Sequence, residues 1–209
     1  MKKFAVLSFA ALALSGFAYG NIIPMLALTQ PTPLGANFNF AYTAILDAQQ
    51  RLDPAATNAP NACNFGTSPC VPPGTFFTIY DFGGFQSVGA IPGSWTATTA
   101  LLGKTPSVGS LSPDDPTITN VSFTYTGPVL AGPAALGTFN IVSSFGLQKI
   151  GQFSAQATNN VSTDISFNKS FQNVGNVGVP LAGVPEPSSM LLIGGGLIGL
   201  GLLRRKLAR

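Results

Sequence analysis

Short apolar runs separated by clusters of glycine and proline are the feature of this sequence that most limits its fold. The chain of 209 residues contains 24 Gly and 17 Pro. These residues end helices and build turns, and no long stretch shows an apolar period of 3.6 residues. The sequence therefore predicts a mainly β fold made of short antiparallel strands. The turn clusters lie at residues 72–74, 83–84, 92–93, 127–128 and 132–133.

Seven segments between these turns have the composition of strands. The alternation is clearest in residues 117–125, where Val121, Phe123 and Tyr125 share one face and polar side chains share the other. Residues 41–51 are the best candidate for a helix, although their first half favours a strand. The pattern predicts an antiparallel β-sandwich, either jelly-roll-like or immunoglobulin-like, over residues 21–183. The expected strands are residues 38–46, 75–80, 94–102, 117–125, 136–143, 151–158 and 163–167.

Charged residues are scarce and unevenly placed. They make up 8% of the chain, and the formal net charge is +3. Six of the ten Lys and Arg residues lie in the two terminal segments, however, and residues 21–187 carry four basic and seven acidic residues, a net charge of −3. A nucleic-acid-binding protein needs a basic stripe, which is missing outside the ends. We therefore expect no nucleic-acid partner.

Residues 1–20 have the layout of a secretory signal peptide. Lys2 and Lys3 precede an apolar run over residues 4–17, and the small residues Ala18 and Gly20 then flank Tyr19. This order of charged, apolar and small-x-small regions is the signal-peptide pattern. The sequence predicts a helical signal that is recognised by the Sec machinery and removed by signal peptidase, after Gly20 or, as the alternative, after Ala18.

Residues 184–209 form a second terminal signal in three parts. A Pro-Glu-Pro motif comes first, an apolar segment at 188–203 follows, and a basic tail at 204–209 closes the chain. Sixteen helical residues span about 24 Å, which is short of the roughly 30 Å hydrocarbon core, so we expect a brief transmembrane helix. The basic residues should stay on the cytoplasmic side and leave the domain outside. The motif consists of Pro185, Glu186 and Pro187, and the basic membrane stop of Arg204, Arg205 and Lys206.

This combination resembles the PEP-CTERM sorting signal of exported proteins from Gram-negative bacteria. The resemblance covers about the last 25 residues of the chain. It implies that an exosortase, a membrane-embedded cysteine peptidase, recognises Pro185, Glu186 and Pro187 as a substrate. It also implies transient residence in the inner membrane, followed by delivery to the cell surface or the extracellular matrix.

The two cysteines, Cys63 and Cys70, are separated by six residues. In an exported chain such a pair is expected to form a disulfide. Closing this loop would stabilise the fold by roughly 2.5 kcal/mol. A metal site is disfavoured, because a third and fourth ligand are missing nearby.

The chain contains no histidine, which excludes the Ser-His-Asp and Cys-His arrangements. Nucleotide-binding glycine motifs are also missing. A pair of aspartates for glycoside hydrolysis stays formally open. Asp114 and Asp115, between two prolines, fit a solvated turn better than a catalytic pair or a weak calcium site. We assign no catalytic residue, metal ligand or cofactor.

The aromatic stretch at residues 76–85 and the single tryptophan, Trp95, admit two interpretations. Aromatic side chains can stack on sugars, but they also fill the cores of sandwiches, and we favour the core. The sequence thus predicts a non-enzymatic surface or matrix protein. A carbohydrate-binding module that contacts extracellular polysaccharide is the alternative, and a hydrolase using two aspartates is a third hypothesis.

Overall fold

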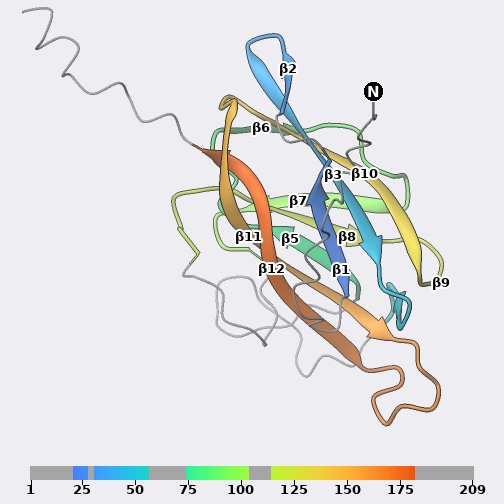
Figure 1. The fold of residues 1–209 in the computed structure, drawn as a ribbon. Coiled ribbons are helices and arrows are strands. Elements are labelled where there is room, and N and C mark those ends of the chain that lie inside the picture. The colour runs from blue at the N-terminus through green and yellow to red at the C-terminus, as the bar shows by residue number, and fades with distance from the viewer. Residues whose placement is uncertain (1–20, 28–30, 57–73, 104–113, 182–209) are drawn as a thin grey trace, which may run out of the picture.

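The computed structural model describes residues 21–27, 31–56, 74–103 and 114–181 (Figure 1). Every regular element in these ranges is a β-strand. The strands form two sheets in which all neighbours are antiparallel. The prediction of a mainly β, antiparallel fold is therefore confirmed.

The first sheet has five strands in the order β1-β3-β10-β6, and β2 pairs with β3 beside β1. Its long central strands, β3 and β10, pair over most of their length, from Ala134 opposite Leu46 to Ser143 opposite Phe38. The strands are β1 (Ile22–Leu26), β2 (Thr32–Leu34), β3 (Asn37–Leu46), β6 (Phe85–Val88) and β10 (Ala134–Ser143).

The second sheet has seven strands in the order β7-β8-β5-β11-β4-β9, and β12 pairs with the other side of β11. The β11–β12 hairpin is the longest pairing, and Figure 1 shows its two orange strands side by side. The strands are β4 (Gln50–Leu52), β5 (Phe76–Ile79), β7 (Trp95–Ala100), β8 (Asn120–Tyr125), β9 (Leu130–Ala131), β11 (Leu147–Asn159) and β12 (Ser170–Leu181).

One hydrophobic core lies between the two sheets. Phe139 on β10 of the first sheet meets three aromatic rings of the second, with centroid distances of 4.9 Å to Phe77, 5.2 Å to Trp95 and 5.0 Å to Phe123. These contacts are edge-to-face, the arrangement that aromatic quadrupoles favour. The sheets thus pack face to face in a sandwich-like arrangement.

The predicted alternation in β8 is confirmed. Val121, Phe123 and Tyr125 are buried in the core, because side chains two residues apart share a face of a strand. The other face is polar, and there the hydroxyl groups of Ser122 and Thr78 are 2.8 Å apart in a buried hydrogen bond.

The predicted strand at residues 38–46 is confirmed, whereas the candidate helix at 41–51 and the predicted strand at 163–167 are not found. Residues 41–51 form the end of β3, a turn and β4, not a helix. Tyr42, Ala44 and Leu46 are buried at alternate positions, and β3 pairs with β1 on one side and β10 on the other. Tertiary pairing thus overrides the weak local preference for a helix.

The predicted strand at residues 163–167 lies instead in a series of turns between β11 and β12. There the Asp164 carboxylate accepts a hydrogen bond from the Ser166 N–H at 2.8 Å, and the Asp164 carbonyl accepts one from the Phe167 N–H at 2.9 Å. Short polar side chains that bond to nearby backbone compete with strand pairing in this way.

Several predictions concern residues outside the described ranges. These are the signal peptide at 1–20, the pair Cys63 and Cys70, and the motif, transmembrane helix and basic tail of residues 184–209. In the part of the chain that the structure does describe, no helix has the length and apolar character needed to cross a membrane.

Candidate functional site

The C-terminal end of β12 connects the folded domain to the terminal signal. β12 pairs with β11 from Ser170 opposite Thr158 to Leu181 opposite Leu147. Val177 and Val179 lie in the core, and the Tyr42 hydroxyl donates a hydrogen bond to the Gly178 carbonyl at 2.8 Å. Burial of this hydroxyl raises the pKa of Tyr42. The last strand is therefore held by both sheets almost to its end.

The acidic residues of the chain are partly brought together around Asn120. The Asn120 side-chain amide donates to both carboxylate oxygens of Asp114, at 2.9 and 3.0 Å. The same carboxylate accepts a hydrogen bond from the Gly103 N–H at 2.9 Å. Asp114 thus joins the residues after β7 to the first residue of β8.

Asp81 and Asp115 meet beside this pair. The Asp81 N–H donates to the Asn120 side-chain oxygen at 2.8 Å, and the Asp81 carboxylate accepts from the Asp115 N–H at 3.1 Å. Partial burial raises the pKa of Asp81, and repulsion from Asp114 and Asp115 adds to this, against the lowering effects of the Asp115 N–H and of Lys149. Asp81 also has a positive φ of 51°, consistent with the turn expected after β5.

The carboxylates in this cluster are used as hydrogen-bond acceptors for turns. Asp115 accepts from the Thr117 hydroxyl at 2.7 Å and from the Thr117 N–H at 2.9 Å, which lowers the pKa of Asp115. Within the described ranges, no three Asp, Glu, Cys or His side chains are grouped so that they could hold a metal ion. The arrangement supports a turn-building role, as the sequence predicts for Asp114 and Asp115.

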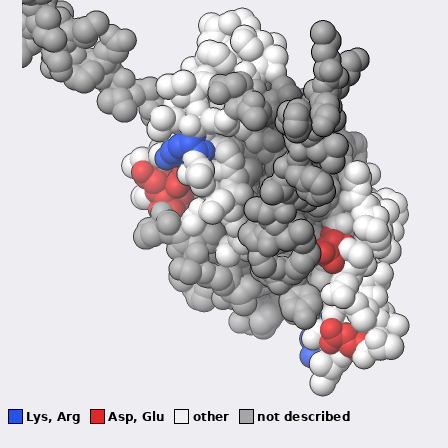
Figure 2. Space-filling model, viewed as in Figure 1, with Lys and Arg blue, Asp and Glu red and all other residues white. Residues whose placement is uncertain are grey.

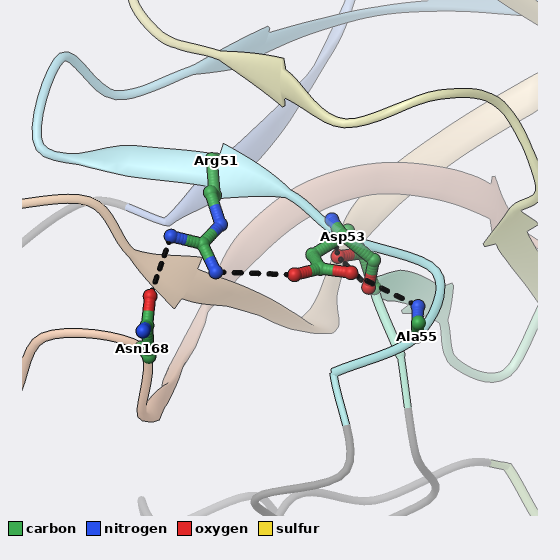
Figure 3. A network of polar contacts seen from close by, with 5 residues as sticks. Arg51, Asp53, Ala55 and Asn168 are labelled. Atoms are coloured by element: carbon green, nitrogen blue, oxygen red, sulfur yellow. Dashed lines mark hydrogen bonds and ion pairs between the residues drawn. The ribbon is translucent and has the colours of Figure 1, made fainter.

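A second polar network links β4 to the β11–β12 connection (Figure 3). Arg51 forms an ion pair with Asp53 at 3.1 Å and donates to the Asn168 side-chain oxygen at 2.6 Å. Its guanidinium also lies 5.6 Å from the ring centre of Phe167, a cation–π distance. Sequence reasoning missed this network, because Asn168 is 117 positions away. The sequence did offer one indication of an ion pair, because Arg51 lies two positions before Asp53 and no other basic residue is near it in the chain.

The aromatic residues considered as a sugar-binding platform lie inside the protein. Phe77, Phe82 and Trp95 belong to the core and are at most 5% exposed. Phe76 is fully buried as well, and the Tyr80 hydroxyl forms a buried 2.8 Å hydrogen bond with the Ser154 hydroxyl. These rings therefore present no exposed platform and lie in the interior as interpreted, whereas Phe85, at the end of the aromatic stretch, is half-buried and packs against the core.

Comparison with known families gives one match, at the C-terminus. Residues 183–206 match the PEP-CTERM protein-sorting motif. The chain carries a PEP-CTERM sorting signal. No curated protein and no solved structure matches the chain.

The PEP-CTERM motif begins two positions after Leu181, the last residue of β12. Its matched range includes Pro185, Glu186 and Pro187 as well as Arg204, Arg205 and Lys206. Such a motif marks an exported protein that passes through a membrane and has an exosortase as its processing partner. The sorting signal is therefore joined directly to the final strand of the β domain.

Proposed function

We propose that this chain is a non-enzymatic surface or extracellular-matrix protein whose β domain is the cargo of its PEP-CTERM signal. In this proposal a signal peptide at residues 1–20 directs export through the Sec machinery. A transmembrane helix at 188–203 then holds the chain briefly in the inner membrane. An exosortase processes it near Pro185–Pro187, and the domain reaches the cell surface or the matrix.

The observation that carries this proposal is the family match at residues 183–206. The position of β12 supports it, because every strand pairing in the part of the chain that the structure describes precedes the Pro-Glu-Pro motif. Cleavage at the motif would therefore leave both sheets intact. The motif is a sorting signal and not an active-site motif, which agrees with a domain that is transported as cargo.

The interior of the domain supports a non-enzymatic role. The acids near Asn120 serve as turn acceptors, and the aromatic side chains of β5 and β7 are buried. Among the residues described on the face seen in Figure 2, the charged side chains form a few separate spots between uncharged ones. Such a surface suits a neutral, hydroxyl-rich environment such as polysaccharide. A carbohydrate-binding module would need a different binding surface from the aromatic residues first considered.

The test is mass spectrometry of the C-terminus on protein recovered from cells and from the medium. The wild type should lose the residues that follow the motif. A double variant, Pro185→Ala with Pro187→Ala, should keep them and stay with the membrane fraction. Pro33→Ala, on the exposed strand β2, serves as the matched control and should be processed like the wild type.

An intact C-terminus on wild-type protein in the medium would overturn the processing step. Chain found only in the cytoplasm, with Met1 retained, would overturn export itself.

A further inference from the structure

Asn21 is built into the domain, although it immediately follows the expected signal-peptide cut. Its side chain is fully buried. The side-chain amide of Asn21 donates to the Phe171 carbonyl on β12, and the Asn21 carbonyl accepts a 3.1 Å hydrogen bond from the Asp47 N–H. Asn21 therefore lies where the edge of the first sheet meets the edge of the second.

Three buried amide oxygens at this seam have no hydrogen-bond donor within the described structure. They are Asn21 Oδ1, Gln50 Oε1 and Asn173 Oδ1. Asn173 lies beside the N-terminal end of β1, because its amide donates to the Ile22 carbonyl at 3.2 Å. Gln50 is connected through the turn, because its N–H donates to the Asp47 carbonyl at 3.1 Å. A buried acceptor without a donor destabilises the fold, so a hydrogen-bond donor placed at this seam would be stabilising.

An acidic residue, Asp47, is the cross-strand neighbour of Asn21. Ile22 is paired with Leu46 in the antiparallel β1–β3 ladder, which puts Asn21 opposite Asp47. The hydrogen bond from the Asp47 N–H to the Asn21 carbonyl agrees with this register. One oxygen of the Asp47 carboxylate accepts the Gln49 N–H at 2.9 Å. The seam thus combines neutral oxygen acceptors with one negative charge.

We propose that this seam is a docking site for the α-ammonium group that hydrolysis of the Gly20–Asn21 bond creates. The proposal rests on the export step proposed above. Water is added across that bond: Gly20 leaves with a carboxylate, and the amine left on Asn21 takes up a proton. The resulting ammonium has three N–H donors, one for each of the three unpaired amide oxygens of Asn21, Gln50 and Asn173, and one positive charge, which the carboxylate of Asp47 balances.

The docking site selects between the two cuts that the sequence allows. Cleavage after Ala18 would leave Tyr19 and Gly20 in front of Asn21, so that its nitrogen would stay a neutral amide with one N–H. Cleavage after Gly20 puts the charge directly at the seam. After the signal peptide is removed, the α-ammonium group would hold the start of β1 in place beside β3 and β12.

Among the described residues, the charged neighbour on the β12 side of the seam is the exposed Lys169, two positions before Phe171. The strands β1, β3, β10 and β12 contain no charged residue, and on β11 the single charge, Lys149, is opposite Val179 near the far end of β12. On β4, Arg51 is engaged by Asp53 and Asn168. Asp47 is therefore the charge that should set the pKa of the new amine, which is about 7.7–8.0 when unperturbed.

The test uses the mature protein recovered from producing cells. Mass spectrometry first identifies its N-terminal residue. Competitive acylation at a series of pH values then gives the reactivity of the α-amine relative to a free peptide that begins with the same residues. We expect Asn21 as the first residue and acylation near pH 8 that is several-fold slower than in the peptide.

Two isosteric variants should shift this reactivity in opposite directions. Asp47→Asn removes the negative charge and should speed acylation several-fold, whereas Gln50→Glu adds one and should slow it further. Asp81→Asn, a matched change at the Asn120 cluster, should leave it unaltered. A purely structural role of Asp47 or Gln50 would not produce opposite shifts.

The outcomes separate this proposal from the export on which it rests. A mature chain that begins at Tyr19, or one that begins at Asn21 but is acylated as fast as the peptide in all variants, overturns the docking site while export stands. A chain that keeps Met1 overturns export and the docking site together.

Discussion

Phe139 on β10 and Trp95 on β7 meet edge to face across the two sheets, with ring centroids 5.2 Å apart and planes inclined by 89°. Trp95 also contacts Phe77 and Tyr125, so a single ring of the first sheet joins an aromatic cluster that spans β5, β7 and β8. This cluster is a central part of the hydrophobic core between the two sheets.

The first prediction concerns this cluster. Phe139→Ala should lower the free energy of unfolding by about 3–5 kcal/mol, because it removes a fully buried ring and leaves a cavity between the sheets. Urea denaturation of the mature protein, followed by tryptophan fluorescence, measures the loss. Ile150→Ala, at a position that is 81% exposed, is the control and should change stability by less than about 0.5 kcal/mol. Equal effects of the two changes would contradict the proposed core.

The second prediction concerns the close approach of Gly132 to the turn after β3. A Cβ added at Gly132 would lie 2.0 Å from the Asp47 carbonyl oxygen, a backbone atom. Gly132→Ala should therefore force the β4–β9 pair apart and cost more than about 3 kcal/mol. Thermal unfolding measures this cost. Gly93→Ala, where nothing lies within 4 Å, is the matched control and should be tolerated.

The third prediction is a pH dependence set by Asp81. Its pKa is raised, chiefly by burial, so the fold favours the protonated carboxyl. That contribution is complete below the ordinary aspartate value of about 3.9 and is lost as pH rises through the raised folded value. Asp81→Asn keeps the acceptor oxygen, tolerates the positive φ and cannot ionise. It should raise the melting temperature at pH 7 and leave it unchanged at pH 3. A lower melting temperature at pH 7 would show that the charge of Asp81 stabilises the fold.

The fourth prediction concerns the Arg51 network. Arg51→Gln removes the ion pair with Asp53 and the contact with Phe167, and it should destabilise the protein by about 1 kcal/mol. Hydrogen exchange should quicken at the Asn168 and Lys169 amides, which close the turns after β11. Lys169→Gln removes a neighbouring charge outside the network and is the control. Unchanged exchange in Arg51→Gln would mean that the backbone turns alone hold this connection.

The sequence was most informative where one face of a strand is buried and the other is polar. In β8, the order of Val121, Phe123 and Tyr125 against Ser122 and Thr124 predicts both the strand and the side that enters the core. The aromatic residues of β5 and β7 could be assigned to the core for a different reason, because large aromatic side chains commonly fill the cores of sandwiches.

Prediction failed where pairing between distant segments decides the structure. β12 contains Gly175 and Gly178, and its inward face includes polar Asn173, so its apolar pattern is weak. Its long register with β11 stabilises it nonetheless. The same holds for β1, where Pro24 is accepted because it lies on an edge strand.

The candidate sites likewise divide into one that is local in the sequence and two that depend on distant residues. The PEP-CTERM motif is contiguous, so its residues could be read directly from the chain. The Asn120 cluster and the Arg51 network join residues far apart in the sequence, and neither distance nor burial could be known before the fold. Asp81 and Asp115 are 34 positions apart and still share a hydrogen bond.

The position of β12 limits how far an enzyme bound at the Pro-Glu-Pro motif can be from the domain. Leu181 is the last paired residue that the structure describes, and Pro185 is four residues further on, a length of chain that spans at most about 14 Å. If the proposed cleavage takes place at the Pro-Glu-Pro motif, the enzyme must therefore act within about 14 Å of the end of β12 as described. Flexible residues inserted between positions 181 and 185 would move the domain away from the motif. Processing of this variant would show whether the enzyme requires the short connection as well as the motif.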